Sequence, residues 1–143
     1  MSWCEQRFHY RFKDDVLLQA ALTHRSHSAN NNERLEFLGD AVLDLVISEF
    51  LYQFYSEQTE GSLSRMRSSL VKGDTLAALA KELDLGEYLV LGKGENTSGG
   101  RERLSLLSNA LEAVIGAIFL DGGYLEAKNA IIKIFDARIQ VLD

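Results

Sequence analysis

Residues 33–44 read Glu33-Arg34-Leu35-Glu36-Phe37-Leu38-Gly39-Asp40-Ala41-Val42-Leu43-Asp44, and this stretch decides the fold. At about 100° per residue of an α-helix, its carboxylates fall within an arc of roughly 80°, while its aliphatic side chains face the opposite way. One side of the predicted helix builds a core, and the other concentrates negative charge. The carboxylates are Glu33, Glu36, Asp40 and Asp44; the aliphatic side chains are Leu35, Leu38, Val42, Leu45 and Val46.

The acidic stripe points to a cation. Like charges at i,i+3 and i,i+4 destabilise an isolated helix by about 0.2–0.5 kcal/mol per pair, so an external cation would relieve the repulsion along this helix. Mg²⁺ and Mn²⁺ are the best candidates because both prefer oxygen ligands. The alternative is a solvated acidic face on an ordinary surface helix. The spacing alone leaves both interpretations open.

Phe37 is out of place on this helix, because it lies beside Glu36 and Asp40 on the polar side. An aromatic ring there would be exposed in a monomer. It is either tucked under a neighbouring loop or an anchor for another protein surface, and such anchors are typically aromatic.

Length and composition indicate one soluble domain spanning residues 1–143. The chain is 46% hydrophobic and 25% charged, as in ordinary globular proteins. Its longest strongly apolar run, Ala113 to Leu120, is far shorter than the about 18 residues of a membrane span. We therefore expect a cytoplasmic protein with no membrane partner. A lone Cys4 excludes an internal disulfide and a cysteine-rich zinc site.

The net charge of −6 argues against nucleic-acid binding, which needs local Lys and Arg for phosphate contacts. The distribution of charge matters more, because much of the acidity belongs to the stripe, and a bound metal ion would neutralise it. Basic residues cluster in two places, Arg65 to Lys72 and Lys93 to Arg103. Nucleic acid therefore remains a possible partner.

Every long segment has an apolar period near 3.6 and the chain lacks proline, so the predicted fold class is all-α. The stretch from Gly92 to Gly100 holds four of the eleven glycines and is expected to be a mobile surface loop. A break is expected at Glu60-Gly61. Helices are predicted from Asp14 or Asp15 to Thr23, from the acidic stripe to Tyr55, and over 62–72, 73–85, 104–120 and 124–141.

The helix that follows the glycine-rich stretch supplies a second half of a candidate site. Asn109 and Glu112 are i,i+3 neighbours, and Gly116 continues the same side with no side chain, which would let another helix approach closely. If that helix is the acidic one, Glu36, Asp40, Asn109 and Glu112 can converge on one cation. The alternative makes Glu112 a surface residue and Gly116 a packing contact only.

Residues Asn32 to Leu43 resemble the signature of the ribonuclease III endonuclease domain of the bacterial type. The similarity extends over nearly the whole chain. It includes Leu22 to Ser26, Glu60-Gly61 with Ser64 to Arg67, Gly92 to Gly100, and Asn109 to Gly123.

This resemblance implies an all-α homodimer that hydrolyses double-stranded RNA and leaves 5′-phosphate and 3′-hydroxyl ends. It implies that Phe37 inserts into a socket on the partner subunit. Arg65, Arg67 and Arg101 are expected contacts to the RNA backbone. The resemblance also implies a catalytic Mg²⁺, replaceable by Mn²⁺, held by Glu36, Asp40, Asn109 and Glu112, with Asp40 and Glu112 as catalytic residues and Glu33 and Glu60 lining an acidic valley.

Two features depart from the family pattern. Position 109 is ordinarily Asp, so Asn109 offers a neutral ligand, and activity is expected to be impaired by it. A catalytically inactive, dimeric RNA-binding or scaffolding relative is the alternative function. The chain also ends where family members usually continue into a double-stranded-RNA-binding domain, so we expect either a minimal form or a fragment.

Overall fold

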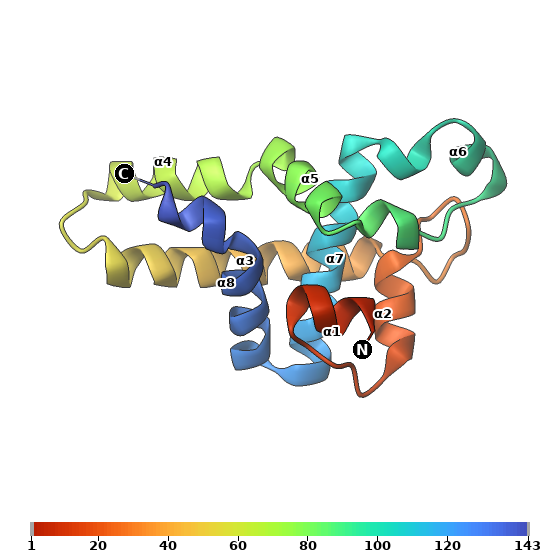
Figure 1. The fold of residues 1–143 in the computed structure, drawn as a ribbon, viewed down its shortest axis with the longest axis horizontal. Coiled ribbons are helices and arrows are strands. Elements are labelled where there is room, and N and C mark those ends of the chain that lie inside the picture. The colour runs from red at the N-terminus through yellow and green to blue at the C-terminus, as the bar shows by residue number, and fades with distance from the viewer. Residues whose placement is uncertain (1, 143) are drawn as a thin grey trace.

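The computed structural model describes residues 2–142 and consists of helices joined by short connections (Figure 1). Its one strand-like feature in these residues is an isolated parallel bridge between Thr23 and Val90. The all-α prediction is confirmed. The elements are α1 (Trp3–Phe8), α2 (Asp15–Leu22), α3 (Glu33–Phe54), α4 (Glu60–Val71), α5 (Gly73–Glu82), η1 (Leu85–Tyr88), α6 (Lys93–Thr97), η2 (Gly100–Glu102), α7 (Leu104–Gly122) and α8 (Tyr124–Gln140).

The core is built around α7, which packs against α2, α3, α5 and α8. Its residues from Ala110 to Ile118 are all buried. By length and composition α7 is apolar enough to cross a membrane, but most of the helix is covered by the rest of the protein. This pattern is that of a central core helix.

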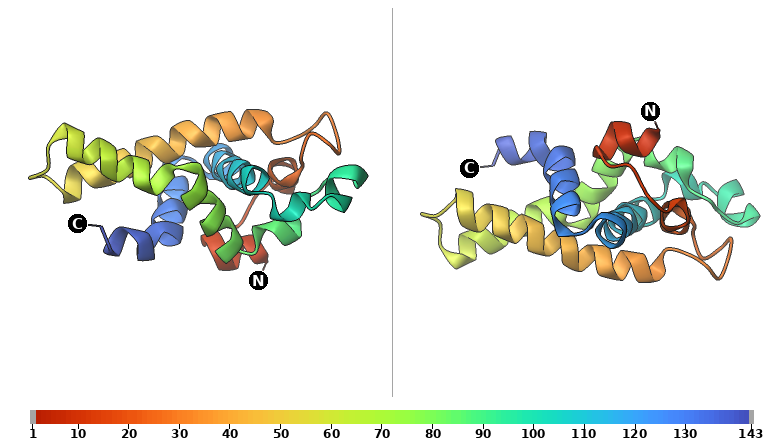
Figure 2. Two further views of the ribbon diagram at one scale, coloured as in Figure 1. Left: turned by 90° about the horizontal axis from the view of Figure 1, so that it is seen from above. Right: turned by 90° about the horizontal axis from the view of Figure 1, so that it is seen from below.

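Helices α3 and α4 form an antiparallel hairpin that projects from one end of the molecule (Figure 2). With its 22 residues, α3 is roughly 33 Å long. Its N-terminal half crosses α7, and its C-terminal half lies under α4 and beside α8 (Figure 1). The two ends of the acidic helix therefore lie in different parts of the protein.

Two predictions about local structure were wrong, and one helix was missed. The helix α1 was not foreseen. The break expected at Glu60-Gly61 is the first turn of α4, because Thr59 caps this helix by accepting a hydrogen bond from the Ser62 N–H. The expected loop from Gly92 to Gly100 contains α6 and the start of η2.

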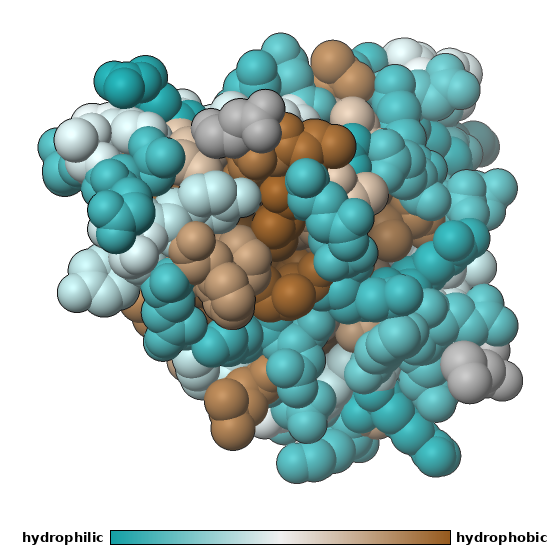
Figure 3. All heavy atoms as spheres, turned by 60° about the vertical axis from the view of Figure 1, so that its left-hand side comes forward, coloured by the Kyte–Doolittle hydropathy of each residue, from teal (hydrophilic) through white to brown (hydrophobic). Residues whose placement is uncertain are grey.

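Several large apolar side chains remain exposed along α3 and at the hairpin. Figure 3 views the molecule with the hairpin end turned forward and shows apolar side chains in a hollow within a mostly hydrophilic surface. The most exposed apolar side chains of α3 are Phe37, Leu45, Tyr52 and Phe54. Such side chains at regular helical spacing indicate a surface that another molecule covers.

Candidate functional site

The candidate site lies where α3 crosses α7 with the two backbones in direct contact. A Cβ added to Gly39 would lie 1.7 Å from the Glu112 carbonyl oxygen, and one added to Gly116 would lie 2.4 Å from the Leu35 carbonyl oxygen. Neither position has room for a side chain. The close approach that the sequence predicted at Gly116 is therefore present, and its partner is the acidic helix.

This crossing places Asp40 against Glu112. The Glu112 side chain is only 9% exposed. Burial raises its pKa to about 9, and a hydrogen bond to Asp40, together with the negative charges of Asp40, Glu36 and Asp44, adds to the effect. The Glu112 carboxyl therefore holds its proton to a much higher pH than an exposed glutamate does.

The two acidic residues on either side of Asp40 are affected in the same direction. Burial raises the pKa of Glu36, and the neighbouring charges of Glu33 and Asp40 raise it further. Burial and the charge of Asp40 raise the pKa of Asp44, although the nearby Arg67 guanidinium partly opposes this. The ionised form is therefore disfavoured at Glu36, Asp44 and Glu112 alike.

The donor set at the crossing fits a hard divalent cation, because it consists of carboxylate oxygens with an excess of negative charge. In residues 2–142, no group of three or more Asp, Glu, His or Cys side chains is arranged so that it could hold a metal ion. Because burial and the neighbouring carboxylates raise the pKa of Glu112, a cation at this position would have to compete with a proton for this carboxyl group.

Asn109 lies one turn before Glu112 on α7 and is partly exposed. It lines a cavity of about 120 Å³ together with Glu33 and Glu36 from the first turn of α3. Glu36 therefore connects the two halves of the site, because it faces this cavity and also acts on Glu112. The structure brings four of the expected metal ligands, Glu36, Asp40, Asn109 and Glu112, to one region.

Glu60 does not join this group within one subunit. It starts α4 at the tip of the hairpin, about 30 Å from Glu33 along the axis of α3. Its carboxylate accepts a hydrogen bond from the Ser64 hydroxyl at 2.8 Å.

The three arginines expected to contact RNA differ in their surroundings. Arg65 is exposed on α4. Arg67 donates to the Ser48 hydroxyl at 2.9 Å, next to Asp44. Arg101 donates to the carbonyls of Gly86 and Leu89 and to Asn96 Oδ1, so its guanidinium holds the connection between η1 and α7 together.

The Phe37 ring projects into solvent, with 83% of the residue exposed. It borders an open groove of about 980 Å³, which is lined in part by Leu17, Ala20, Leu38 and Leu120. The sequence left two roles open for this ring. The structure excludes a ring tucked under a neighbouring loop, because no loop covers it, and leaves the role of an anchor for another protein surface.

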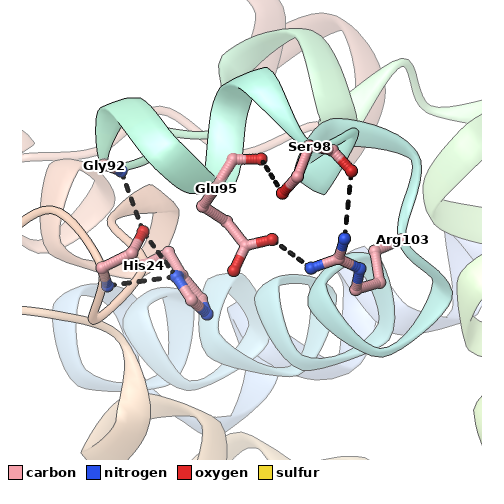
Figure 4. Close-up of polar contacts among 6 residues, drawn as sticks. His24, Gly92, Glu95, Ser98 and Arg103 are labelled. Carbon is pink, nitrogen blue, oxygen red and sulfur yellow. Dashed lines mark hydrogen bonds and ion pairs between the residues drawn. The ribbon is translucent and has the colours of Figure 1, made fainter.

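Sequence reasoning gave no role to two residues that also line the cavity beside Asn109, namely His24 and Asn32. His24 was noted only as part of a matching motif. Its ring is held by the following residues of its loop, and that loop is tied to α6 through Gly92 (Figure 4). Asn32 is only 5% exposed. Its burial follows from the packed structure, and the sequence carries no signal for it.

The segment around α6 that supports His24 is itself braced by charge. Glu95 forms an ion pair with Arg103, whose guanidinium also donates to the Ser98 carbonyl at 3.1 Å (Figure 4). Gly100 packs so closely on Glu95 that an added Cβ would lie 2.7 Å from its Cγ. These contacts explain why the glycine-rich stretch is structured.

Comparison with known proteins agrees with this architecture. Ribonuclease 3 of Hahella chejuensis is 53% identical over 134 residues, and ribonuclease 3 of Nitrosococcus oceani is 50% identical over 133 residues. The matches cover 94% and 93% of this chain but only 59% and 57% of those two proteins. The chain thus spans less than two thirds of the length of these relatives.

A solved structure of the ribonuclease III nuclease domain from Campylobacter jejuni superimposes with a TM-score of 0.94 at 44% identity. The match covers 98% of this chain and 99% of that one, and structural flexibility is described for the region of that domain involved in dimer formation. The family described as ribonuclease-III-like matches residues 14–138 of this chain. From its sequence, its fold and the paired carboxyl groups at the crossing of α3 and α7, this chain belongs to the ribonuclease-III-like family.

Proposed function

We propose that this chain is the catalytic part of an endoribonuclease that hydrolyses phosphodiester bonds in double-stranded RNA with the help of Mg²⁺. The observation that carries the proposal is the contact of the exposed Asp40 with the buried Glu112, crowded by two further carboxylates. A structural role alone does not explain this arrangement, because like charges brought together cost stability. Perturbed carboxyl groups of this kind gather at catalytic sites.

Each residue of the site would have a distinct role in phosphodiester hydrolysis. Asp40 and Glu112 would hold the cation, which would supply a bound water of lowered pKa and positive charge opposite the leaving 3′ oxygen. Glu36 supplies a further carboxylate, and the Asn109 side-chain oxygen completes the set without adding charge. Attack of water on the phosphorus then leaves 5′-phosphate and 3′-hydroxyl ends. Mn²⁺ would substitute for Mg²⁺.

Double-stranded RNA would be recognised by shape, through its phosphates and 2′-hydroxyl groups. The exposed guanidinium of Arg65 is best placed for a phosphate contact, since Arg67 and Arg101 already hold internal partners. Glu33 and Glu60 would extend the acidic surface on either side of the metal ligands. We expect this activity in the cytoplasm.

The active form would be a homodimer. Phe37, Leu45 and Tyr52 are 83%, 57% and 75% exposed and fall on one side of α3, next to the acidic stripe. An apolar stripe of this length on a helix fits a second copy of the same stripe across a two-fold axis. Because α3 would then run antiparallel to its partner, Glu60 of one subunit could approach the acidic N-terminal half of the other α3.

Asn109 supports the second candidate function, an inactive RNA-binding or scaffolding dimer. Loss of one unit charge beside a divalent ion weakens binding by at most several kcal/mol at an effective dielectric constant near 20, with a Coulomb ceiling of roughly 8 kcal/mol at 4 Å. The remaining three carboxylates favour a nuclease of reduced activity over a protein without chemistry.

Cleavage of long double-stranded RNA at low ionic strength, with Mg²⁺ or Mn²⁺, tests the proposal. We expect weak cutting by the protein, stronger cutting by Asn109→Asp, and none by Glu112→Gln. Glu126→Gln, which changes an exposed carboxylate on α8, is the matched control and keeps full activity. The proposal fails if folded, dimeric Asn109→Asp makes no cuts with either metal. End analysis of the products checks for 5′-phosphate.

A further inference from the structure

Several of the polar side chains that line the cavity of about 120 Å³ beside Asn109 have polar atoms without a protein partner, whereas Arg25 and Glu33 in the same lining form an ion pair. Within residues 2–142, no hydrogen bond is made by His24 Nε2, Asn32 Oδ1, the Ser105 hydroxyl or the Asn109 carboxamide, yet all four residues line the cavity. No buried polar atom in the described part of the chain lacks a partner, so these atoms must be reachable from the cavity. The volume corresponds to about four waters at roughly 30 Å³ each.

The side chain of Asn32 is held in a fixed orientation at the cavity. Its residue is 5% exposed, and its Nδ2 donates to the Ala21 carbonyl at 3.2 Å. This bond fixes the orientation of the carboxamide and leaves Oδ1 without a protein partner but accessible from the cavity. A water or a ligand in the cavity can therefore supply the hydrogen bond whose absence would cost about 1–3 kcal/mol at a buried acceptor.

The His24 ring is held in one orientation by its own loop. The Ser26 N–H donates to His24 Nδ1 at 3.1 Å, and the Ser26 hydroxyl lies 2.8 Å from the same nitrogen (Figure 4). Because Nδ1 accepts a backbone N–H, the proton of the neutral ring resides on Nε2. The Gly92 N–H in turn donates to the Ser26 hydroxyl at 2.8 Å, and Gly92 packs directly on the Ser26 carbonyl.

These contacts give the cavity one fixed donor, His24 Nε2–H, and one fixed acceptor, Asn32 Oδ1. Glu36 and Asn109, both expected to hold the metal, line the same cavity. We infer that His24 is a positioning residue, which orients Glu36 and Asn109 through water molecules held in this cavity. The inference rests on the proposed function, since it concerns the ligands of the same metal ion.

The Asn109 side chain needs such orientation because it is a weak metal ligand. A neutral carboxamide gains little from charge, so its orientation matters more for binding a cation. Outer hydrogen bonds that fix metal ligands typically contribute 10- to 100-fold in affinity. The cavity supplies such bonds from a loop that the rest of the fold holds rigid.

Mn²⁺ titration of the dimeric protein, followed calorimetrically, tests the inference. His24→Ala is expected to bind Mn²⁺ about 10- to 100-fold more weakly, and His24→Gln, which keeps an N–H donor, to recover most of the loss. His27→Ala is the matched control, because His27 is exposed in the same loop and does not line the cavity. Ser105→Ala, an exposed change at the start of α7, should weaken binding by a smaller factor without affecting folding.

A second readout needs no metal. The nitrogen chemical shifts of the His24 ring are expected to report a proton on Nε2 in the neutral form. A proton on Nδ1 would overturn the inference, and so would Mn²⁺ affinity of His24→Ala within twofold of the unsubstituted protein. Equal losses of Mn²⁺ affinity in His24→Ala and His24→Gln would assign the effect to packing and would also reject the inference. If the unsubstituted protein binds no Mn²⁺, the proposed function itself fails.

Discussion

Gly39 on α3 and Gly116 on α7 meet at a point where each helix backbone is the other's nearest neighbour. The residue after Gly39 is Asp40, and Glu112 lies one turn before Gly116. The absence of two side chains therefore creates the contact between two carboxyl groups. The site depends on this backbone contact as much as on its acidic residues.

Gly39→Ala and Gly116→Ala are each expected to destabilise the protein by about 3 kcal/mol or more, because overpacking costs 1–3 kcal/mol where neighbours can move and here the neighbours are backbone atoms. Gly61→Ala is the matched control. It is also helical, but its added Cβ would lie 3.5 Å from the flexible Arg65 side chain. This substitution is expected to be neutral or stabilising by up to about 1 kcal/mol. Urea denaturation at fixed protein concentration measures all three, and equal effects at Gly39 and Gly61 would contradict the close crossing.

Stability of the metal-free protein is expected to fall as the pH rises from about 4.5 to about 9. Glu112 keeps its proton up to a pKa of about 9 when folded, whereas in the unfolded chain it loses the proton near its ordinary value of 4.5. The folded state therefore binds the extra proton throughout this range, and stability falls by at most about 1.4 kcal/mol per pH unit.

Glu112→Gln removes this dependence, because the amide resembles the protonated acid. Denaturation in the presence of a chelator from pH 5 to 9 compares the variant with the unsubstituted protein. A residual slope is expected from Glu36 and Asp44, whose pKa values are also raised. Identical slopes for the two proteins would mean that Glu112 is ionised in the folded state.

Phe37→Ala is expected to weaken dimerisation by at least about 2 kcal/mol, or roughly 30-fold, as is typical of an aromatic anchor at an interface. Leu125→Ala is the control, because Leu125 is 70% exposed but lies on α8, away from the stripe on α3. Sedimentation over a range of concentrations measures both. A monomeric starting protein, or equal dimerisation of both variants, would exclude Phe37 as the anchor.

Asn109→Asp is expected to change metal-free and metal-bound stability in opposite directions. A fourth carboxylate lowers the melting temperature in a chelator, because it adds repulsion near Glu36 and Glu112. The rise in melting temperature on adding Mg²⁺ becomes larger, following the mass-action form for a ligand of the native state. Scanning calorimetry measures both shifts, and Asn129→Asp on α8 controls for added charge. A smaller response to Mg²⁺ in Asn109→Asp would contradict the role given to this position.

The sequence was sufficient to predict the helices that carry the site, since α3 and α7 are long and their apolar residues follow the helical period. The convergence of Glu36, Asp40 and Glu112 was also predictable, because a glycine on α7 marked the point of close approach. Periodicity did not reveal α1, whose six residues make fewer than two turns. Apolar periodicity also could not predict the structure of the glycine-rich stretch, because this stretch is held by the side-chain contacts of Arg101 and Arg103.

The cavity and the raised pKa of Glu112 were beyond prediction for a different reason. His24 and Asn32 lie in a polar loop, where nothing in the composition separates a buried side chain from a solvated one. Protonation of Glu112 depends on its burial and on its contact with Asp40, which are properties of the packed structure. The raised pKa of Glu36 likewise follows from the environment that the fold creates.

The crossing of α3 and α7 also sets the order of events during synthesis. Asp40 emerges about seventy residues before Glu112, and at 5–20 residues per second this interval lasts several seconds. Throughout it, the carboxylates of α3 remain hydrated, and the apolar face of the same helix has no α7 to pack against. The contact between Asp40 and Glu112 is thus absent from every shorter intermediate of the growing chain and can form only once the central helix α7 has been synthesised.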